Sequence, residues 1–222
     1  KELRPVMIEL NFTNMMDCAL GDRGISDRQI EATRGSLPAL HNKIRDRAVP
    51  GLSFIDLLSQ DTGKIKETAT FIRENSDDFL LLGIGGSALG PRAILDSLSP
   101  FHNLKKRPRV FICDNVDPAT LRNILSVIDI KRTSVNVITK SGSTAETASS
   151  FMVIWDELRK AFGSRASERV VATTDPEKGN LRMIANELGF RTLAIPAGVG
   201  GRYSVLSPVG LLAAEVIGID SV

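Results

Sequence analysis

Short apolar runs alternate with helix-patterned segments along the chain from Ser76 onward. The runs are largely apolar, as is typical of strands buried on both faces of a parallel sheet. With right-handed crossovers, this alternation predicts a doubly wound α/β fold: a five-stranded parallel sheet flanked by helices over residues 76–222. The expected strands are residues 79–84, 110–113, 135–138, 170–173 and 192–195. The expected helices are residues 91–98, 118–127, 143–162 and 179–188, with a final helix after Ser207-Pro208.

Residues 1–75 follow a helical pattern without strand-like runs. A cap at Ser26-Asp27 predicts a helix to about Asp46, and the step from Gly35 to Pro38 is expected to interrupt or kink it. A further helix is expected over residues 65–75. Because this segment carries no recognisable chemistry, we expect a helical N-terminal part, 1–75, that packs on the sheet domain, 76–222.

Composition excludes some classes of function. The formal net charge is +2, which gives no case for nucleic-acid binding, and no apolar run approaches the roughly 20 residues that span a bilayer. Cys18 and Cys113 lie among apolar residues without a metal-ligand spacing, so we expect two buried thiols rather than a disulfide. The basic cluster Lys105–Arg109 is expected to be a solvated surface loop. A cytoplasmic location fits these features.

The segment Thr139–Thr147, TKSGSTAET, lies between an expected strand and a long expected helix. Its hydroxyls and backbone N–H groups can donate hydrogen bonds, Lys140 supplies positive charge, and the helix N-terminus adds its dipole. A glycine in the middle allows the backbone to approach a ligand closely. These features predict an oxyanion site, most simply for phosphate. The alternative is a Ser/Thr-rich helix cap without a ligand.

Other strand–helix turns belong to the same edge of the expected sheet. Gly83–Pro91, GIGGSALGP, allows tight backbone turns, offers Ser87 as a donor, and places Pro91 where a first helical residue is favoured. It lacks both the dinucleotide G-x-G-x-x-G spacing and the Gly-Lys-Ser/Thr of a P-loop. Should the first and third strands be neighbours, Ser87 and Ser141 can face one ligand.

Arg202 lies in a glycine-flanked stretch after the last expected strand. This setting suggests a guanidinium carried close to a ligand, and the alternative is an ion pair with a local carboxylate. In the turn before residue 118 we expect a structural role, with Asp117 capping the helix that follows it. The turn at 173–176 can either bind a ligand or cap a helix, and a cap is favoured.

Three stretches together resemble the glucose-6-phosphate isomerase (phosphoglucose isomerase) family: GIGGSALGP at 83–91, TKSGSTAET at 139–147 and GVGGRYSVLSPVG at 198–210. The resemblance implies two sugar-isomerase (SIS) domains, of which this chain holds the first. It implies that Arg202, with Gly201, lies near the reacting carbons and that Glu146 supports a catalytic histidine from elsewhere. The Gly86 backbone would contact the substrate. The implied phosphate ligands are Ser87, Thr139, Lys140, Ser141 and Thr144.

The implied reaction interconverts glucose 6-phosphate and fructose 6-phosphate through an enediol, in glycolysis and gluconeogenesis. It needs a general base but no metal or redox cofactor. By resemblance, the base glutamate, the ring-opening histidine and a lysine belong to a second SIS domain beyond residue 222, and the full-length protein is a homodimer. His41 and His102 fall outside the motifs. We therefore expect this chain to bind the sugar phosphate and to be inactive alone.

Two other functions fit parts of the pattern. A non-catalytic SIS domain that senses sugar phosphates would keep the phosphate site but would not require the GGRYS stretch at 200–204. A nucleotide-binding domain fits less well, because the glycine fingerprint is missing. The presence of Arg202 in its glycine-rich setting favours the enzyme.

Overall fold

The computed structural model describes residues 11–221. Residues 1–10 of the predicted N-terminal part and residue 222 of the predicted sheet domain therefore lie outside it. The described chain divides between Pro50 and Gly51 into two compact units. Helix α4 (Gly63–Asn75) packs against α10 (Pro208–Val216) within the second unit. The predicted N-terminal segment is thus spread over both units, and its boundary at residue 75 remains a prediction.

The first unit consists of short helices. Ser26 forms the predicted cap: its hydroxyl accepts from the Gln29 N–H, and the Gln29 side chain accepts from the Ser26 N–H, a complete capping box. The predicted helix is interrupted at Gly35-Ser36, directly before Pro38. Its elements are η1 (Thr13–Met15), α1 (Asp17–Leu20), η2 (Gly21–Arg23), α2 (Asp27–Arg34) and α3 (Leu37–Arg45).

Little side-chain surface is buried in the described part of this unit, where Met16 is the one buried residue. Cys18 is exposed, so the expectation of a buried thiol is wrong there. Its helix, α1, has only four residues and no buried position. Cys113, on a strand of the second unit, is buried as expected.

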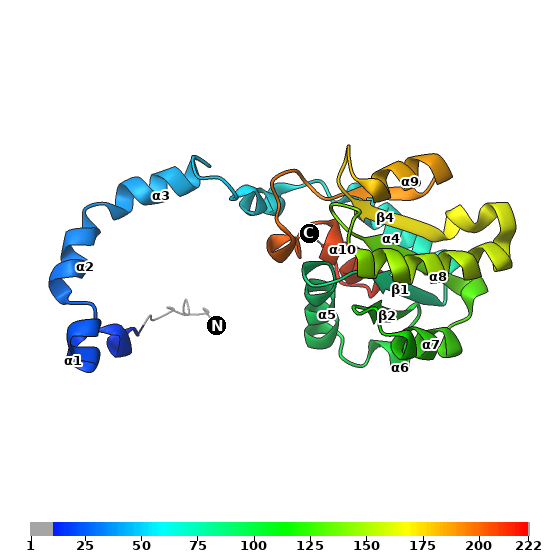
Figure 1. Cartoon of the computed structure of the whole chain (residues 1–222), viewed down its shortest axis with the longest axis horizontal. Coiled ribbons are helices and arrows are strands. Elements are labelled where there is room, and N and C mark those ends of the chain that lie inside the picture. The colour runs from blue at the N-terminus through cyan, green and yellow to red at the C-terminus, as the bar shows by residue number, and fades with distance from the viewer. Residues whose placement is uncertain (1–10, 222) are drawn as a thin grey trace, which may run out of the picture. The chain divides into compact units, whose positions relative to one another are not determined.

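The second unit contains the predicted five-stranded sheet, parallel throughout, in the order β2-β1-β3-β4-β5 (Figure 1). The three central strands are buried along their whole length, which is why their sequences are largely apolar. The strands are β1 (Asp78–Leu82), β2 (Arg109–Cys113), β3 (Thr133–Ile138), β4 (Val170–Thr174) and β5 (Arg191–Ala194).

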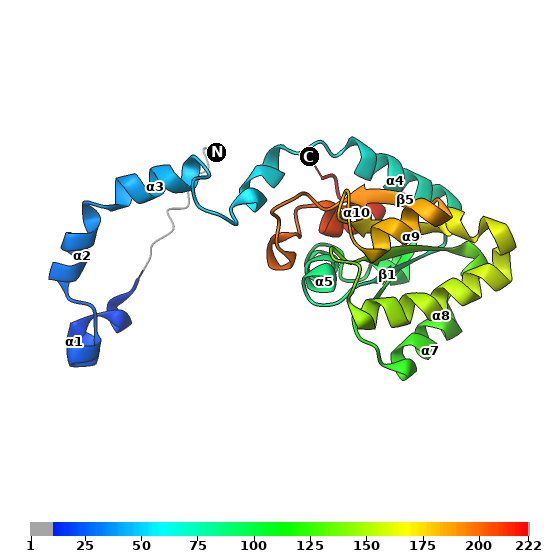
Figure 2. The same ribbon diagram turned by 45° about the horizontal axis from the view of Figure 1, so that its top comes forward.

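Helices cover both faces of this sheet, as Figures 1 and 2 show. One face carries α4, α10 and α5 (Gly86–Leu98). The other carries α7 (Pro118–Val127), α8 (Ala145–Phe162) and α9 (Asn180–Leu188). The connecting elements are η3 (Ser53–Ser59), α6 (His102–Lys105), η4 (Ile130–Arg132), η5 (Gly163–Arg169) and η6 (Gly201–Tyr203). The second unit is therefore the predicted three-layer, doubly wound domain.

Two local predictions need correction and one is confirmed. Helix α5 begins at Gly86, so Pro91 lies inside it rather than at its first position. Arg109 is not a solvated loop residue: it pairs bidentately with the buried carboxylate of Asp78 at 2.6 and 3.0 Å, because β1 and β2 begin side by side. Asp117 caps α7 as predicted, accepting from two backbone N–H groups.

Candidate functional site

The sheet reverses its strand order between β1 and β3, which are neighbours as the site prediction required. The chain leaves β1 into α5 on one face of the sheet and leaves β3 into α8 on the other. Their turns therefore diverge at the carboxyl edge and leave a crevice between them, the usual ligand site of open α/β sheets.

A cavity of about 540 Å³ lies at this edge, and we call it the switch-point cavity. It brings together the side chains predicted as anion ligands on the β1–α5 and β3–α8 turns. The β4–α9 turn completes its wall, a position that the sequence left open while favouring a cap. The lining residues are Ser87, Thr139, Lys140, Ser141, Thr144, Asp175, Lys178 and Gly179.

Hydroxyl groups of the β3–α8 turn are linked to one another. The Thr139 hydroxyl accepts from the Gly142 N–H at 3.2 Å and lies 3.2 Å from the Thr144 hydroxyl. Ser143 donates to the Ser141 hydroxyl at 2.9 Å. Gly142 has a φ of +71°, a conformation that favours glycine. The turn thus holds its donors in one region without a Ser or Thr side chain capping α8.

Lys140 connects this turn to the glycine-rich stretch that precedes Arg202. Its Nζ donates to the Val199 carbonyl at 2.9 Å while the side chain lines the switch-point cavity. An ammonium carries three N–H donors, so one is committed to the protein backbone and two remain for a ligand. Lys140 therefore has a structural contact as well as a place in the predicted anion site.

The β1–α5 turn and the loop carrying Arg202 touch backbone to backbone. A Cβ at Gly86 would lie 2.1 Å from the Gly201 carbonyl oxygen and 3.2 Å from the Arg202 nitrogen. The glycine at 86 is explained by this close approach. The contact fixes the Arg202 loop beside the start of α5, the helix that also carries Ser87.

Arg202 and Glu146 do not line the switch-point cavity. Both are exposed, and neither makes an ion pair or side-chain hydrogen bond with any residue from 11 to 221. The alternative of a local carboxylate partner for Arg202 is thus not found in the described chain. Glu146 lies in the first turn of α8, two residues after Thr144.

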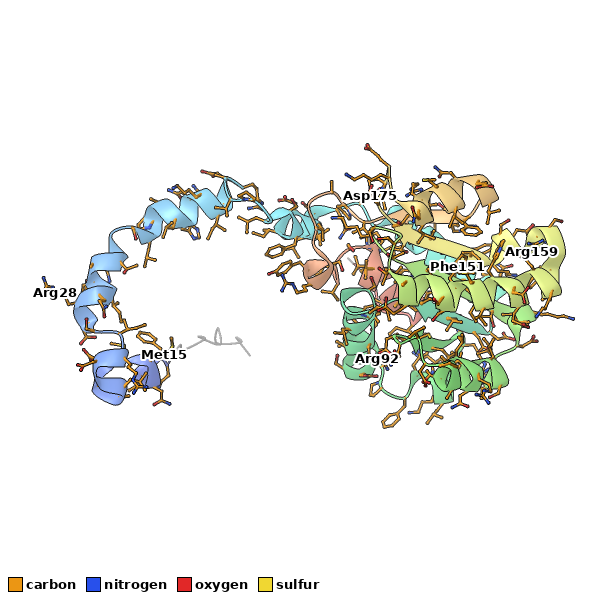
Figure 3. The ribbon with its side chains drawn as sticks, viewed as in Figure 1. Met15, Arg28, Arg92, Phe151, Arg159 and Asp175 are labelled. Carbon is orange, nitrogen blue, oxygen red and sulfur yellow. The ribbon has the colours of Figure 1, made fainter. Side chains whose placement is uncertain are left out.

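The β4–α9 turn contributes a buried carboxylate. Asp175 is 8% exposed and accepts from the Glu177 and Lys178 N–H groups at 3.0 and 3.1 Å. These hydrogen bonds, with the nearby ammonium groups of Lys178 and Lys140, hold the pKa of Asp175 below its ordinary value. The favoured cap at 173–176 is wrong in position, because the N-cap of α9 is Gly179. Asp175, labelled in Figure 3, lies in the turn before the helix instead and accepts hydrogen bonds from that turn.

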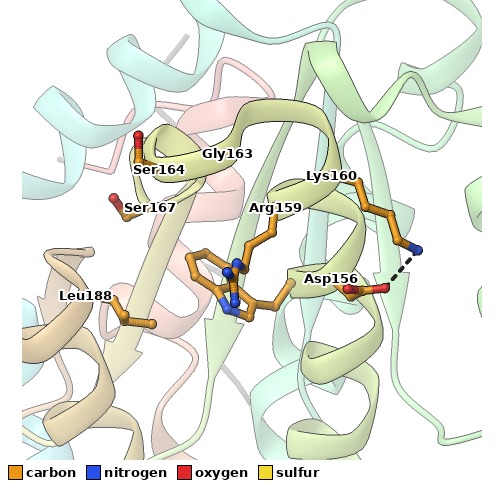
Figure 4. Close-up of a pocket in the computed structure, with 8 residues that line it drawn as sticks. Asp156, Arg159, Lys160, Gly163, Ser164, Ser167 and Leu188 are labelled. Carbon is orange, nitrogen blue, oxygen red and sulfur yellow. Dashed lines mark ion pairs between the residues drawn. The ribbon is translucent and has the colours of Figure 1, made fainter.

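A larger cavity, about 780 Å³, lies near the other end of α8 (Figure 4). It is lined by Trp155, Arg159 and Leu188 among others, and none of the predicted site residues reaches it. Lys160 in its wall pairs with Asp156 at 2.8 Å. The switch-point cavity, with its hydroxyls and ammonium groups, therefore remains the candidate site.

From residue 11 to 221, no three His, Cys, Asp or Glu side chains are grouped so that they could hold a metal ion. Over the same range no helix has the length and apolar character required to cross a bilayer.

Comparison with known proteins places the sequence among sugar-phosphate isomerases. The family model described as phosphoglucose isomerase matches residues 60–222. A glucose-6-phosphate isomerase of Carboxydothermus hydrogenoformans is 39% identical, over 96% of this chain and 48% of its own length. One from Rubrobacter xylanophilus is 42% identical, over 96% of this chain and 50% of its own length. The chain thus spans about half the length of the curated relatives it matches.

Solved structures agree with the fold. A hypothetical protein from Thermus thermophilus superposes with a TM-score of 0.72 at 38% identity, covering 86% of this chain and 46% of that one. A glucose-6-phosphate isomerase from Chlamydia trachomatis gives a TM-score of 0.57 at 26% identity, covering 68% and 28%. The Vibrio vulnificus NanR protein, solved in complex with ManNAc-6P, has a TM-score of 0.51 at 14% identity and supports the fold alone.

Proposed function

Because the chain belongs to the phosphoglucose isomerase family, we propose that it supplies the sugar-phosphate site of an enzyme that interconverts glucose 6-phosphate and fructose 6-phosphate. One observation carries the proposal: the five predicted phosphate ligands from two separate turns line a single cavity at the switch point of the sheet. We also propose a second SIS domain and a second copy of the chain as partners in the whole protein. Its place is cytoplasmic, in glycolysis and gluconeogenesis.

The phosphate would be held by hydroxyls and an ammonium group. The hydroxyl-bearing residues Ser87, Ser141 and Thr144 line the switch-point cavity, and Lys140 adds positive charge. Hydrogen bonds to an ionised group are stronger than neutral ones, so several donors converging on one anion favour phosphate over a neutral sugar. Fixing the phosphate end orients the remote carbons for reaction.

Arg202 would act at the other end of the sugar. It is exposed, has no partner in the described chain, and sits on a loop fixed against α5 through Gly86 and Gly201. A guanidinium beside the reacting carbons would stabilise the negative charge of an enediolate. Glu146 would orient a catalytic histidine supplied from elsewhere.

We propose that the base that transfers the proton is not one of the residues of the switch-point cavity. Asp175 is the one carboxylate among the described residues of its wall, and its lowered pKa makes it a poor proton acceptor near neutral pH. We therefore propose that the chain binds the sugar phosphate but does not turn it over alone. A coupled assay of fructose 6-phosphate consumption would show sustained turnover if this part of the proposal were wrong.

Calorimetric titration with 6-phosphogluconate tests the site itself. Ser141→Ala removes a hydroxyl from the switch-point cavity and should weaken binding about tenfold, the effect of losing a charge-assisted hydrogen bond. Ser164→Ala is the matched control, because Ser164 lines the larger cavity at the other end of α8. Equal affinities of the two variants would contradict the proposed site. Binding of 6-phosphogluconate by a whole protein that shows no isomerase turnover would favour a sensor.

A further inference from the structure

Building on the proposed sugar-phosphate site, we propose that Lys178, on the turn between β4 and α9, is a second cation of this site and contacts the phosphate directly. Lys178 lines the switch-point cavity, and its ammonium makes neither an ion pair nor a hydrogen bond with the residues from 11 to 221, although it is near enough to Asp175 for the two charges to attract. Asp175, labelled in Figure 3, marks the turn.

Backbone packing fixes this turn against the predicted phosphate turn. A Cβ at Gly179 would lie 2.6 Å from the Ser141 carbonyl oxygen, and one at Gly142 would lie 2.3 Å from the Leu181 nitrogen. Lys178 directly precedes Gly179, so its main chain lies next to backbone that contacts the Ser141 turn. Its side chain reaches the cavity without any rearrangement of the main chain.

Hydrogen bonds to Asp175 stabilise the β4–α9 turn. Its carboxylate accepts the Lys178 N–H at 3.1 Å, and its carbonyl accepts from the Arg182 side chain at 2.9 Å. The main chain at Lys178 is thus tied at both sides, to Asp175 and through Gly179 to Ser141. The Lys178 side chain itself is exposed and can adjust its position to contact a ligand.

The charges in the cavity wall give Lys178 a role that Lys140 cannot fill alone. Lys140 has one N–H on the Val199 carbonyl, and the ionised Asp175 opposes the positive charges of both Lys178 and Lys140. Lys140 and Asp175 alone would leave the wall with no net charge toward a phosphate dianion. Lys178 makes the wall positive, which favours the anion by Coulomb attraction.

The test compares three variants of the 222-residue chain in calorimetric titrations with 6-phosphogluconate at several salt concentrations. Lys178→Ala should weaken binding about tenfold at low salt and make the affinity less dependent on salt, because an exposed ion pair is screened. Lys178→Arg should bind nearly as the parent chain does. Lys131→Ala is the control, since Lys131 precedes the amino end of β3, away from the cavity.

Other outcomes would overturn the proposal in distinguishable ways. Parent-like binding by Lys178→Ala, with binding still weakened by Ser141→Ala, would remove Lys178 from the site and leave the proposed function standing. Equal weakening by the Ala and Arg variants, with an unchanged salt dependence, would show that Lys178 only shapes the turn. A parent chain that does not bind 6-phosphogluconate would overturn both proposals together.

Discussion

Replacing Gly86 by alanine should separate the two loops that frame the switch-point cavity. The added Cβ would lie 2.1 Å from the Gly201 carbonyl oxygen, so the two atoms must move apart by about 0.9 Å to reach the 3.0 Å limit of real Cβ contacts. The opposing atom is backbone and cannot rotate away. Either α5 or the Arg202 loop has to shift.

The cost can be bounded from two opposing terms. Gly86 is the first residue of α5, and its φ is not positive. Alanine at this position should therefore favour the helix by at most about 1 kcal/mol. Overpacking against a fixed neighbour costs about 1–3 kcal/mol. With the middle of each range, about 2 and about 0.5 kcal/mol, the net loss of unfolding free energy should be about 1.5 kcal/mol, which lowers the melting temperature by a few degrees in a chain of this size.

Urea unfolding followed by circular dichroism measures this loss. Gly201→Ala is the matched control, because a Cβ on that residue would meet no atom within 4 Å although it lies on the same loop. We expect the control to change the unfolding free energy by less than about 0.5 kcal/mol. If Gly86→Ala were as stable as the parent chain, the backbone contact between the loops would be refuted.

Three further predictions concern the rest of the molecule. Arg109→Ala leaves the buried Asp78 carboxylate without its partner and should lower the unfolding free energy by about 3 kcal/mol, measured in urea; an effect below about 1 kcal/mol would contradict the pairing. The pKa of Asp175 is lowered from its ordinary value of 3.8, so its ionised form stabilises the fold above pH 3.8, and this stabilisation is lost as the pH falls further. The difference in unfolding free energy between the parent chain and Asp175→Asn should therefore shrink below pH 3.8. Urea unfolding at several pH values measures it, and a constant difference would oppose the assignment. Cys18 should react with a thiol reagent in the native state at least about tenfold faster than Cys113, which mass spectrometry can check; equal rates would contradict the exposures.

The sheet could be predicted because strands that are buried on both faces require runs of largely apolar residues, which can be recognised in the sequence. Strand residues 79–82 are apolar without interruption, and residues 135–138 are apolar except at Asn136. The start of α5 could not be predicted because Gly86 and Gly90 are poor helix formers. Glycine is needed at both positions because of close contacts with Gly201 and Val205, which lie far away in the sequence.

The two turns around β1 and β3 could be predicted as a site because their residue types carry chemistry. For the β4–α9 turn the sequence left a ligand role open and favoured a cap, because residues 173–176 fit either role and Lys178 belongs to no motif. The bond from Lys140 to Val199 spans 59 residues and depends on how two loops meet. Such pairings arise from the strand order rather than from local sequence.

The hydrogen bond from Lys140 to the Val199 carbonyl has a consequence for catalysis under the proposed function. The same ammonium would serve the phosphate and the loop that carries Arg202, so occupancy at one end of the sugar would influence the alignment of the guanidinium at the other. Binding energy from a non-reacting group can in this way lower the barrier at the reacting carbons. A sugar without its phosphate would then lose turnover number as well as affinity, and adding free phosphate could restore part of the rate.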